Sequence, residues 1–78
     1  MVREFTHTFG VQDCVIAVGR YEDWFIAKAF TVDSSGVRRA AMNGQGSPAE
    51  FREHHEDPAL GEAIVFLTNR FGESQSHV

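Results

Sequence analysis

Apolar residues occupy positions 14–18 without interruption, and a second apolar run at 24–27 follows a short polar turn. A half-exposed strand alternates apolar and polar residues, whereas these runs place apolar side chains on both faces. Residues 2–9 do alternate, which predicts an amphipathic edge strand. The pattern therefore predicts strands at about 2–9, 14–20 and 24–32. The second face of the sheet needs a cover, which a helix, a second copy of the chain or a partner protein would provide.

The middle of the chain predicts a hairpin and a short helix. Residues 33–36 read Asp-Ser-Ser-Gly, a hairpin signal because Asp and Ser bond to nearby backbone and Gly accepts a positive φ. A fourth strand at about 37–42 would follow. Residues 47–50 read Ser-Pro-Ala-Glu, a capping box with Pro at the first helical position, which predicts a short polar helix at about 48–55.

The C-terminal part predicts the main helix, at about 58–71. Asp57 would be its acidic cap, and Gly72 would end it. Residues 73–78 are polar and are expected to form a frayed tail. The apolar positions of the helix recur three and four residues apart and form one stripe: Leu60, Ala63, Ile64, Leu67 and Phe71.

These elements predict one α+β domain over residues 1–78: an antiparallel meander of three to four strands with the C-terminal helix packed on one face. With tight turns, Phe9 faces Cys14, Arg20 faces Phe25 and Val32 faces Val37. One face then carries Phe5, His7, Phe9, Cys14, Ile16, Val18, Phe25, Ala27, Ala29, Ala40 and Met42. The second face carries Val15, Ala17, Trp24, Ile26, Lys28, Phe30, Val32 and Arg39. Because alanines permit a close approach, we expect the helix on the first face.

Charge and composition exclude several classes of function. The formal charge of −4 argues against a nucleic-acid partner, which needs a basic face, and against docking on anionic lipid. No apolar run is long enough to span a membrane, and the N-terminus does not have the pattern of a secretory signal. A single cysteine cannot form an internal disulfide, so we expect a reducing compartment, the cytoplasm.

The densest ionisable segment, residues 50–57, predicts an interaction surface rather than a metal site. Glu50 and His54 would share a helical face, but no second group of ligands lies at metal-binding spacing. We therefore expect no metal and no cofactor. The acidic side chains of the segment would instead attract basic partners: Glu50, Glu53, Glu56 and Asp57.

Catalytic chemistry has little support in the sequence. Cys14 and His7 would lie on one face, but Cys14 is flanked by apolar residues, which makes a thiol inert. The glycines at 44 and 46 precede a predicted helix but lack the Lys of a phosphate-binding loop. We therefore expect no enzymatic activity.

The aromatic cluster on the second face is the strongest candidate for a binding site. Trp and Tyr are frequent anchors of interfaces, and here they lie near apolar neighbours and a cation. The predicted contact residues are Tyr21, Trp24, Ile26, Phe30 and Arg39. The competing interpretation is that these side chains belong to the core.

No motif identifies a family. The strand-to-helix order is similar to that of HicB-like antitoxins and of three-stranded DNA-binding domains, although the sheets of the latter are basic. In size and acidity the chain resembles phage-encoded inhibitors such as anti-CRISPR proteins. The predicted function is a small acidic protein-binding module that inhibits or regulates a larger complex. The alternative is an antitoxin-like or structural homodimer that buries sheet face on sheet face.

Overall fold

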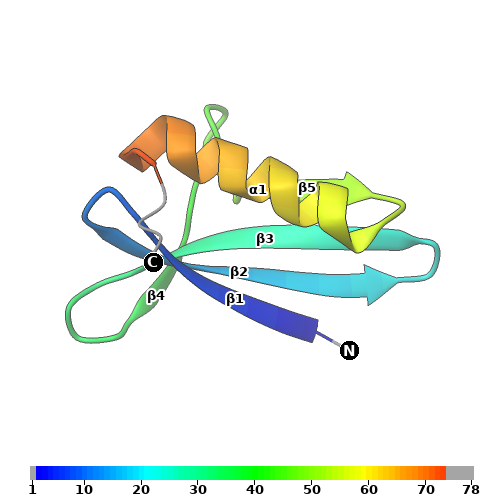
Figure 1. Cartoon of the computed structure of the whole chain (residues 1–78), viewed down its shortest axis with the longest axis horizontal. Coiled ribbons are helices and arrows are strands. Elements are labelled where there is room, and N and C mark those ends of the chain that lie inside the picture. Colours follow the sequence, from blue (N-terminus) through cyan, green and yellow to red (C-terminus); the bar gives the residue numbers. More distant parts are fainter. Residues whose placement is uncertain (1, 74–78) are drawn as a thin grey trace.

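The computed structural model describes residues 2–73 and shows an antiparallel sheet with one helix packed on it (Figure 1). The predicted α+β fold with a C-terminal helix is therefore confirmed. The elements in chain order are β1 (Val2–Phe9), β2 (Gln12–Tyr21), β3 (Trp24–Val32), β4 (Arg38–Ala40), β5 (Glu50–Glu53) and α1 (Glu56–Phe71).

The strands follow the order β1-β2-β3-β4, and β5 adds to the edge of β3. Two short strands thus share that edge: residues 30–32 of β3 pair with β4, and residues 25–28 pair with β5. Between them, Ala41 donates its amide to Ala29 at 2.9 Å, and Ala49 donates to Ala41 at 2.8 Å. The chain leaves the edge at Ala41, forms a loop and returns at Ala49.

The predicted short helix at 48–55 is wrong, because residues 50–53 form strand β5. Pro48 forms a bridge with Met42, and the loop between them closes on Asn43, whose side-chain oxygen accepts two backbone amides. Without β5, the backbone groups on half of the outer edge of β3 would have no strand partner. This long-range requirement outweighs the local capping-box pattern.

The hairpin at 33–37 confirms the predicted turn but shifts the predicted register of β4 by one residue. The Asp33 carboxylate accepts hydrogen bonds from the Ser35 hydroxyl and amide and from the Val37 amide, and these bonds lower its pKa. Val37 therefore belongs to the loop, and Val32 pairs with Arg38. The shift exchanges the predicted faces of Ala40 and Arg39.

The other turns preserve the predicted faces. The first turn comprises only residues 10–11, so Phe9 pairs with Gln12 and not with Cys14 as predicted. This two-residue difference leaves the side-chain parity unchanged. Arg20 pairs with Phe25, as predicted.

The core lies between α1 and the first face of the sheet, as predicted. The fully buried residues of the helix, Ala59, Ala63 and Leu67, lie four residues apart and form a straight line along it. Leu60, Ile64 and Phe71 are partly buried beside that line. The sheet contributes Phe9, Cys14, Ile16, Val18, Ala27 and Ala29 to the same cluster.

The helix begins one residue before its predicted cap. His55 is the N-cap, with extended backbone and no capping side-chain bond, so Asp57 lies in the first turn. Pro58 is tolerated there because a first-turn amide has no partner within the helix. Gly72 follows the last helical residue at φ 112° and donates its amide to Thr68, so its predicted role as the stop is confirmed.

The turn between β1 and β2 is fixed against the end of α1. Gly10 has φ +61°, and a Cβ atom there would lie 2.2 Å from the carbonyl oxygen of Phe71. Its amide donates to the carbonyl of Glu73 at 3.0 Å. The rest of the predicted frayed tail, residues 74–78, lies outside the described residues.

The first prediction tests the helix–sheet core. Replacing Leu67 with Ala should lower the free energy of unfolding by about 2–5 kcal/mol, because the side chain is fully buried. Val65→Ala is the control on the same helix, because Val65 is 59% exposed; it should change stability by less than about 0.5 kcal/mol. Urea denaturation followed by circular dichroism measures both. Equal midpoints for the two variants would contradict the helix orientation.

The second prediction concerns the Gly10 contact. Gly10→Ala and Gly36→Ala both place a side chain at positive φ, which costs about 1–2 kcal/mol. A Cβ at Gly36 meets no atom within 4 Å, whereas one at Gly10 meets Phe71 backbone. Gly10→Ala should therefore destabilise the protein clearly more than Gly36→Ala in the same denaturation assay. If Gly36→Ala costs as much, the β1–β2 turn does not pack on the helix end.

Candidate functional site

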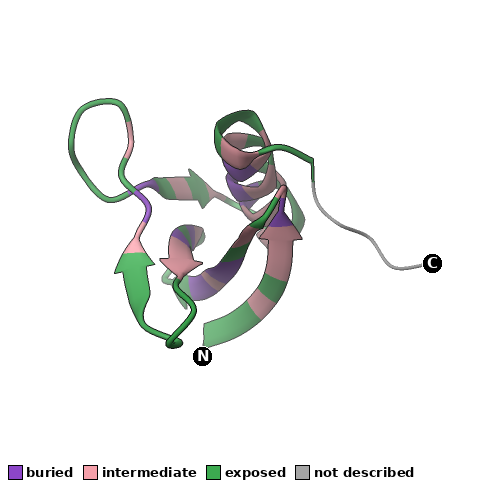
Figure 2. Cartoon of the chain, turned by 90° about the vertical axis from the view of Figure 1, so that its left-hand side faces the viewer, coloured by how far each residue is buried: buried purple, intermediate pink, exposed green. Residues whose placement is uncertain are grey.

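The sheet curves toward its second face, and this curvature covers part of that face (Figure 2). Arg38 on β4 donates two hydrogen bonds to Glu4 on β1, at 2.7 and 2.8 Å, and this contact lowers the pKa of Glu4. In a flat sheet these strands would lie about 14 Å apart, so the contact requires the sheet to curve toward this face. Val15, which lies between them, is only 6% exposed.

One end of this face leaves aromatic side chains exposed at the β2–β3 turn. Tyr21 and Trp24 are paired across the turn and are 49% and 36% exposed. The Trp24 ring stacks on His54 with 4.0 Å between centroids, and the Arg52 guanidinium lies 5.5 Å from the ring centroid. The Nδ1 atom of His54 lies 3.2 Å from the Asp23 carbonyl oxygen. Arg52 of β5 and His54, which directly follows the strand, therefore shield part of the Trp24 ring.

The remaining residues of the predicted aromatic site are less accessible or lie elsewhere. Ile26 and Phe30 are half-buried on the second face, as the register requires. Arg39 pairs with Thr31 and lies on the first face, so the predicted grouping of Arg39 with Trp24 is wrong. The cation beside this cluster is Arg52.

The predicted acidic residues do not form one surface, because their segment is a strand and a helix start. Glu50 lies opposite Lys28, on the same side of the sheet as Trp24, whereas Glu53 lies on the side that carries α1. Glu56 accepts a hydrogen bond from Arg3 at 2.6 Å. Asp57 is exposed in the first turn of the helix.

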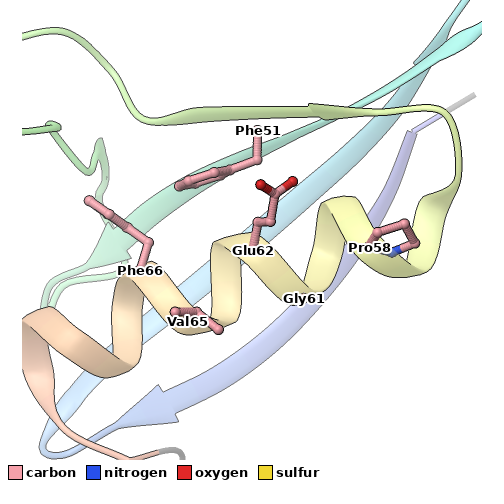
Figure 3. A pocket seen from close by; sticks show the side chains of 6 residues that line it. All are labelled: Phe51, Pro58, Gly61, Glu62, Val65 and Phe66. Atoms are coloured by element: carbon pink, nitrogen blue, oxygen red, sulfur yellow. The ribbon is translucent and has the colours of Figure 1, made fainter.

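An open groove of about 560 Å³ runs between α1 and β5 on the side of Glu53 (Figure 3). The Phe51 ring points from β5 toward Phe66 on the helix, with 5.6 Å between the ring centroids. Both rings are partly exposed, and Val65 extends the apolar surface along the helix. The lining residues are Phe51, Pro58, Gly61, Glu62, Val65 and Phe66.

Two carboxyl groups meet at the edge of this groove. Glu62 points from α1 toward β5 (Figure 3), where Glu53 lies on the side of the sheet that carries the helix. Interaction with the Glu53 carboxyl, together with desolvation, raises the pKa of Glu62 above its ordinary value of 4.5. The pair therefore repels itself when both groups are ionised, and a cation placed beside it would relieve the repulsion.

Gly61 is one of the residues that line the groove. It lies in the interior of α1, and a Cβ atom there would meet nothing within 4 Å. A glycine in a helix interior is less stable than an alanine by about 1 kcal/mol. No contact of the backbone requires glycine at this position.

The predicted Cys14–His7 pair is directly opposed across β1 and β2, but it is unsuited to catalysis. Cys14 is fully buried, and burial together with the charge of Asp13 raises the pKa of its thiol to about 11. A thiol with this pKa is not a nucleophile at neutral pH.

Within residues 2–73, no three His, Cys, Asp or Glu side chains are grouped as metal ligands. No helix in the same range is long and apolar enough to cross a membrane. No protein-family model, curated protein or solved structure matches this chain. The proposals below therefore rest on the geometry and chemistry of the chain itself.

The groove was not predicted from the sequence, because its residues come from two elements, and one of these, β5, differs from the predicted short helix. Phe51 was assigned to a short helix, and Val65 and Phe66 lie outside the predicted apolar stripe. A partial signal was present, because Gly61 and the apolar Val65 lie on the side of the helix away from the core stripe.

The third prediction uses the carboxyl pair. Because the pKa of Glu62 is raised in the folded state, the native protein binds more protons than the unfolded chain. The contribution of Glu62 to the free energy of unfolding is therefore greatest below about pH 4.5. It is lost as the pH rises through the pKa that Glu62 has in the folded protein. Glu62→Gln should raise the melting temperature at pH 7 and leave it nearly unchanged near pH 4.

A double-mutant cycle is the control for this prediction. Adding Glu53→Gln to Glu62→Gln should give little further gain at pH 7, because the first substitution already removes the repulsion. Additive gains would show that the two carboxyls do not interact.

Proposed function

We propose that the protein is a small non-enzymatic protein-binding module that inhibits or regulates a larger protein, and that its binding site is the groove between α1 and β5. The observation that supports this proposal is the groove itself: two partly exposed aromatic rings and Val65 form an apolar surface beside acidic side chains. Apolar centres with polar rims are typical of protein interfaces. A single, fully buried and unpaired cysteine is compatible with action in the cytoplasm.

The exposed Tyr21–Trp24 corner is a second contact surface in this proposal. It lies on the other side of β5, so a partner that covers this strand would touch both sites. The homodimer hypothesis has less support, because the Arg38–Glu4 pair crosses the sheet face that such a dimer would bury.

The fourth prediction tests the binding site with quantitative affinity capture from the cells that make the protein. Wild type should enrich one partner or complex that Gly61→Leu loses, because Gly61 lines the groove, a Cβ atom there meets nothing within 4 Å, and the longer side chain would occupy the open space. Val37→Ser is the control, since Val37 is 50% exposed in the distant β3–β4 hairpin. That variant should capture the same partner as wild type.

Circular dichroism must first show that Gly61→Leu is folded as well as wild type. Capture that is unaffected by Gly61→Leu would contradict the groove as the binding site. A dimeric mass for wild type, with no enriched partner, would favour the homodimer instead.

A further inference from the structure

The residues that line the groove indicate the chemistry of the segment that would bind there. It is apolar along Phe51, Val65 and Phe66 and carries the Glu53–Glu62 carboxyl pair at its edge. Resting on the proposed function, we infer that the groove receives a segment of a partner protein in which a lysine or arginine lies directly beside a large apolar residue. The apolar side chain contacts Phe51 and Phe66, and the cationic head lies against Glu53 and Glu62.

Charge complementarity supports this occupant. The chain carries a net charge of −4, and the carboxyl pair has no basic partner among the hydrogen bonds and ion pairs of residues 2–73. Two carboxylates held together form a site for one cation, and a guanidinium can bond both. Two other acids already have basic partners: Glu4 is paired with Arg38 and Glu56 with Arg3.

The apolar walls distinguish a side-chain cation from a metal ion. A calcium ion needs six to eight oxygen ligands, and the groove brings two carboxyl groups. A lysine or arginine has an apolar stem, which packs on aromatic surface while its head stays polar. Arg70 lies 5.1 Å from the centroid of Phe66, so the groove has a cation near one end and the carboxyl pair along its edge.

Two energetic penalties coincide at this groove. The raised pKa of Glu62 shows that the ionised pair is unfavourable in the free protein, and Gly61 weakens the helix at the same place. Neither Gly61 nor the Glu53–Glu62 pair contributes a buried side chain to the hydrophobic core. Both are explained if the groove stays open and acidic in order to bind a cation-bearing segment.

The fifth prediction tests this inference with a displayed library of random peptides selected on the wild-type protein. Enriched peptides should contain Lys or Arg adjacent to Leu, Ile, Phe or Met. A synthetic copy of the most enriched peptide is then titrated against variants by fluorescence anisotropy. The Glu53→Gln/Glu62→Gln variant should weaken binding by about tenfold or more, because it removes both charges that face the cation.

The matched control is Glu50→Gln/Glu73→Gln, which makes the same change in net charge away from the groove. It should weaken binding by less than about threefold, as expected for solvated charges. Gly61→Leu should abolish binding of the same peptide. All variants are compared only after their melting curves show a folded protein.

Each other result is decisive. Enriched peptides without a cation, whose binding is lost in Gly61→Leu but unaffected by Glu53→Gln/Glu62→Gln, would overturn the charged occupant and leave the groove as a binding site. Equal losses in the two double variants would show that only net charge matters and would overturn the inference. Binding that survives Gly61→Leu would contradict the inference and the groove alike. If no peptide is enriched, the inference fails, while affinity capture still decides the proposed function.

Discussion

The close packing of α1 on β3 through small side chains is the contact on which the rest of the structure depends. Ala27 and Ala29 of the sheet and Ala59 and Ala63 of the helix belong to one fully buried cluster, and Leu67 extends it. Small residues on both sides let the helix axis approach the sheet, and the larger side chains then fill the space around this seam. A chain of 78 residues can form only a small core, so the close packing at this seam constrains where the bulky residues around it can lie.

The groove follows from the same contact. With α1 drawn onto β3, the neighbouring strand β5 lies beside the helix, and Phe51 faces Phe66 at the border of the core and not within it (Figure 3). The two rings bury one side against each other and leave the other side exposed. Pro58 and Gly61 are too small to close the space next to them. An open apolar surface therefore remains on the side of the molecule that carries the helix.

Local patterns predicted most of the fold, and long-range pairing explains what they missed. Continuous apolar runs defined β3 at 24–32, and the spacing of apolar residues with Gly72 defined the end of α1. The register of β4 depended on the hydrogen bonds that close the turn on Asp33, which no periodicity reveals. Strand β5 has one apolar residue among four, and it is a strand because the edge of β3 needs a partner. The groove needs Phe51 of β5 as well as the helix, so the signal in the helix alone could not predict it.

The apolar second face of the sheet indicated binding in the sequence, yet the structure covers much of it without a partner. Curvature and the Arg38–Glu4 pair enclose Val15, and β5 brings His54 and Arg52 onto Trp24. The surface whose residues lower the stability of the free protein is the groove, on the opposite side of β5 from Trp24. There a helix-interior glycine and the repulsion between the ionised Glu53 and Glu62 carboxyls both lower stability, although a Cβ atom at Gly61 would meet nothing within 4 Å. Residues that lower the stability of the free protein are expected at binding sites. At such positions the free energy of the complex favours the residue, although the free energy of the unbound fold does not.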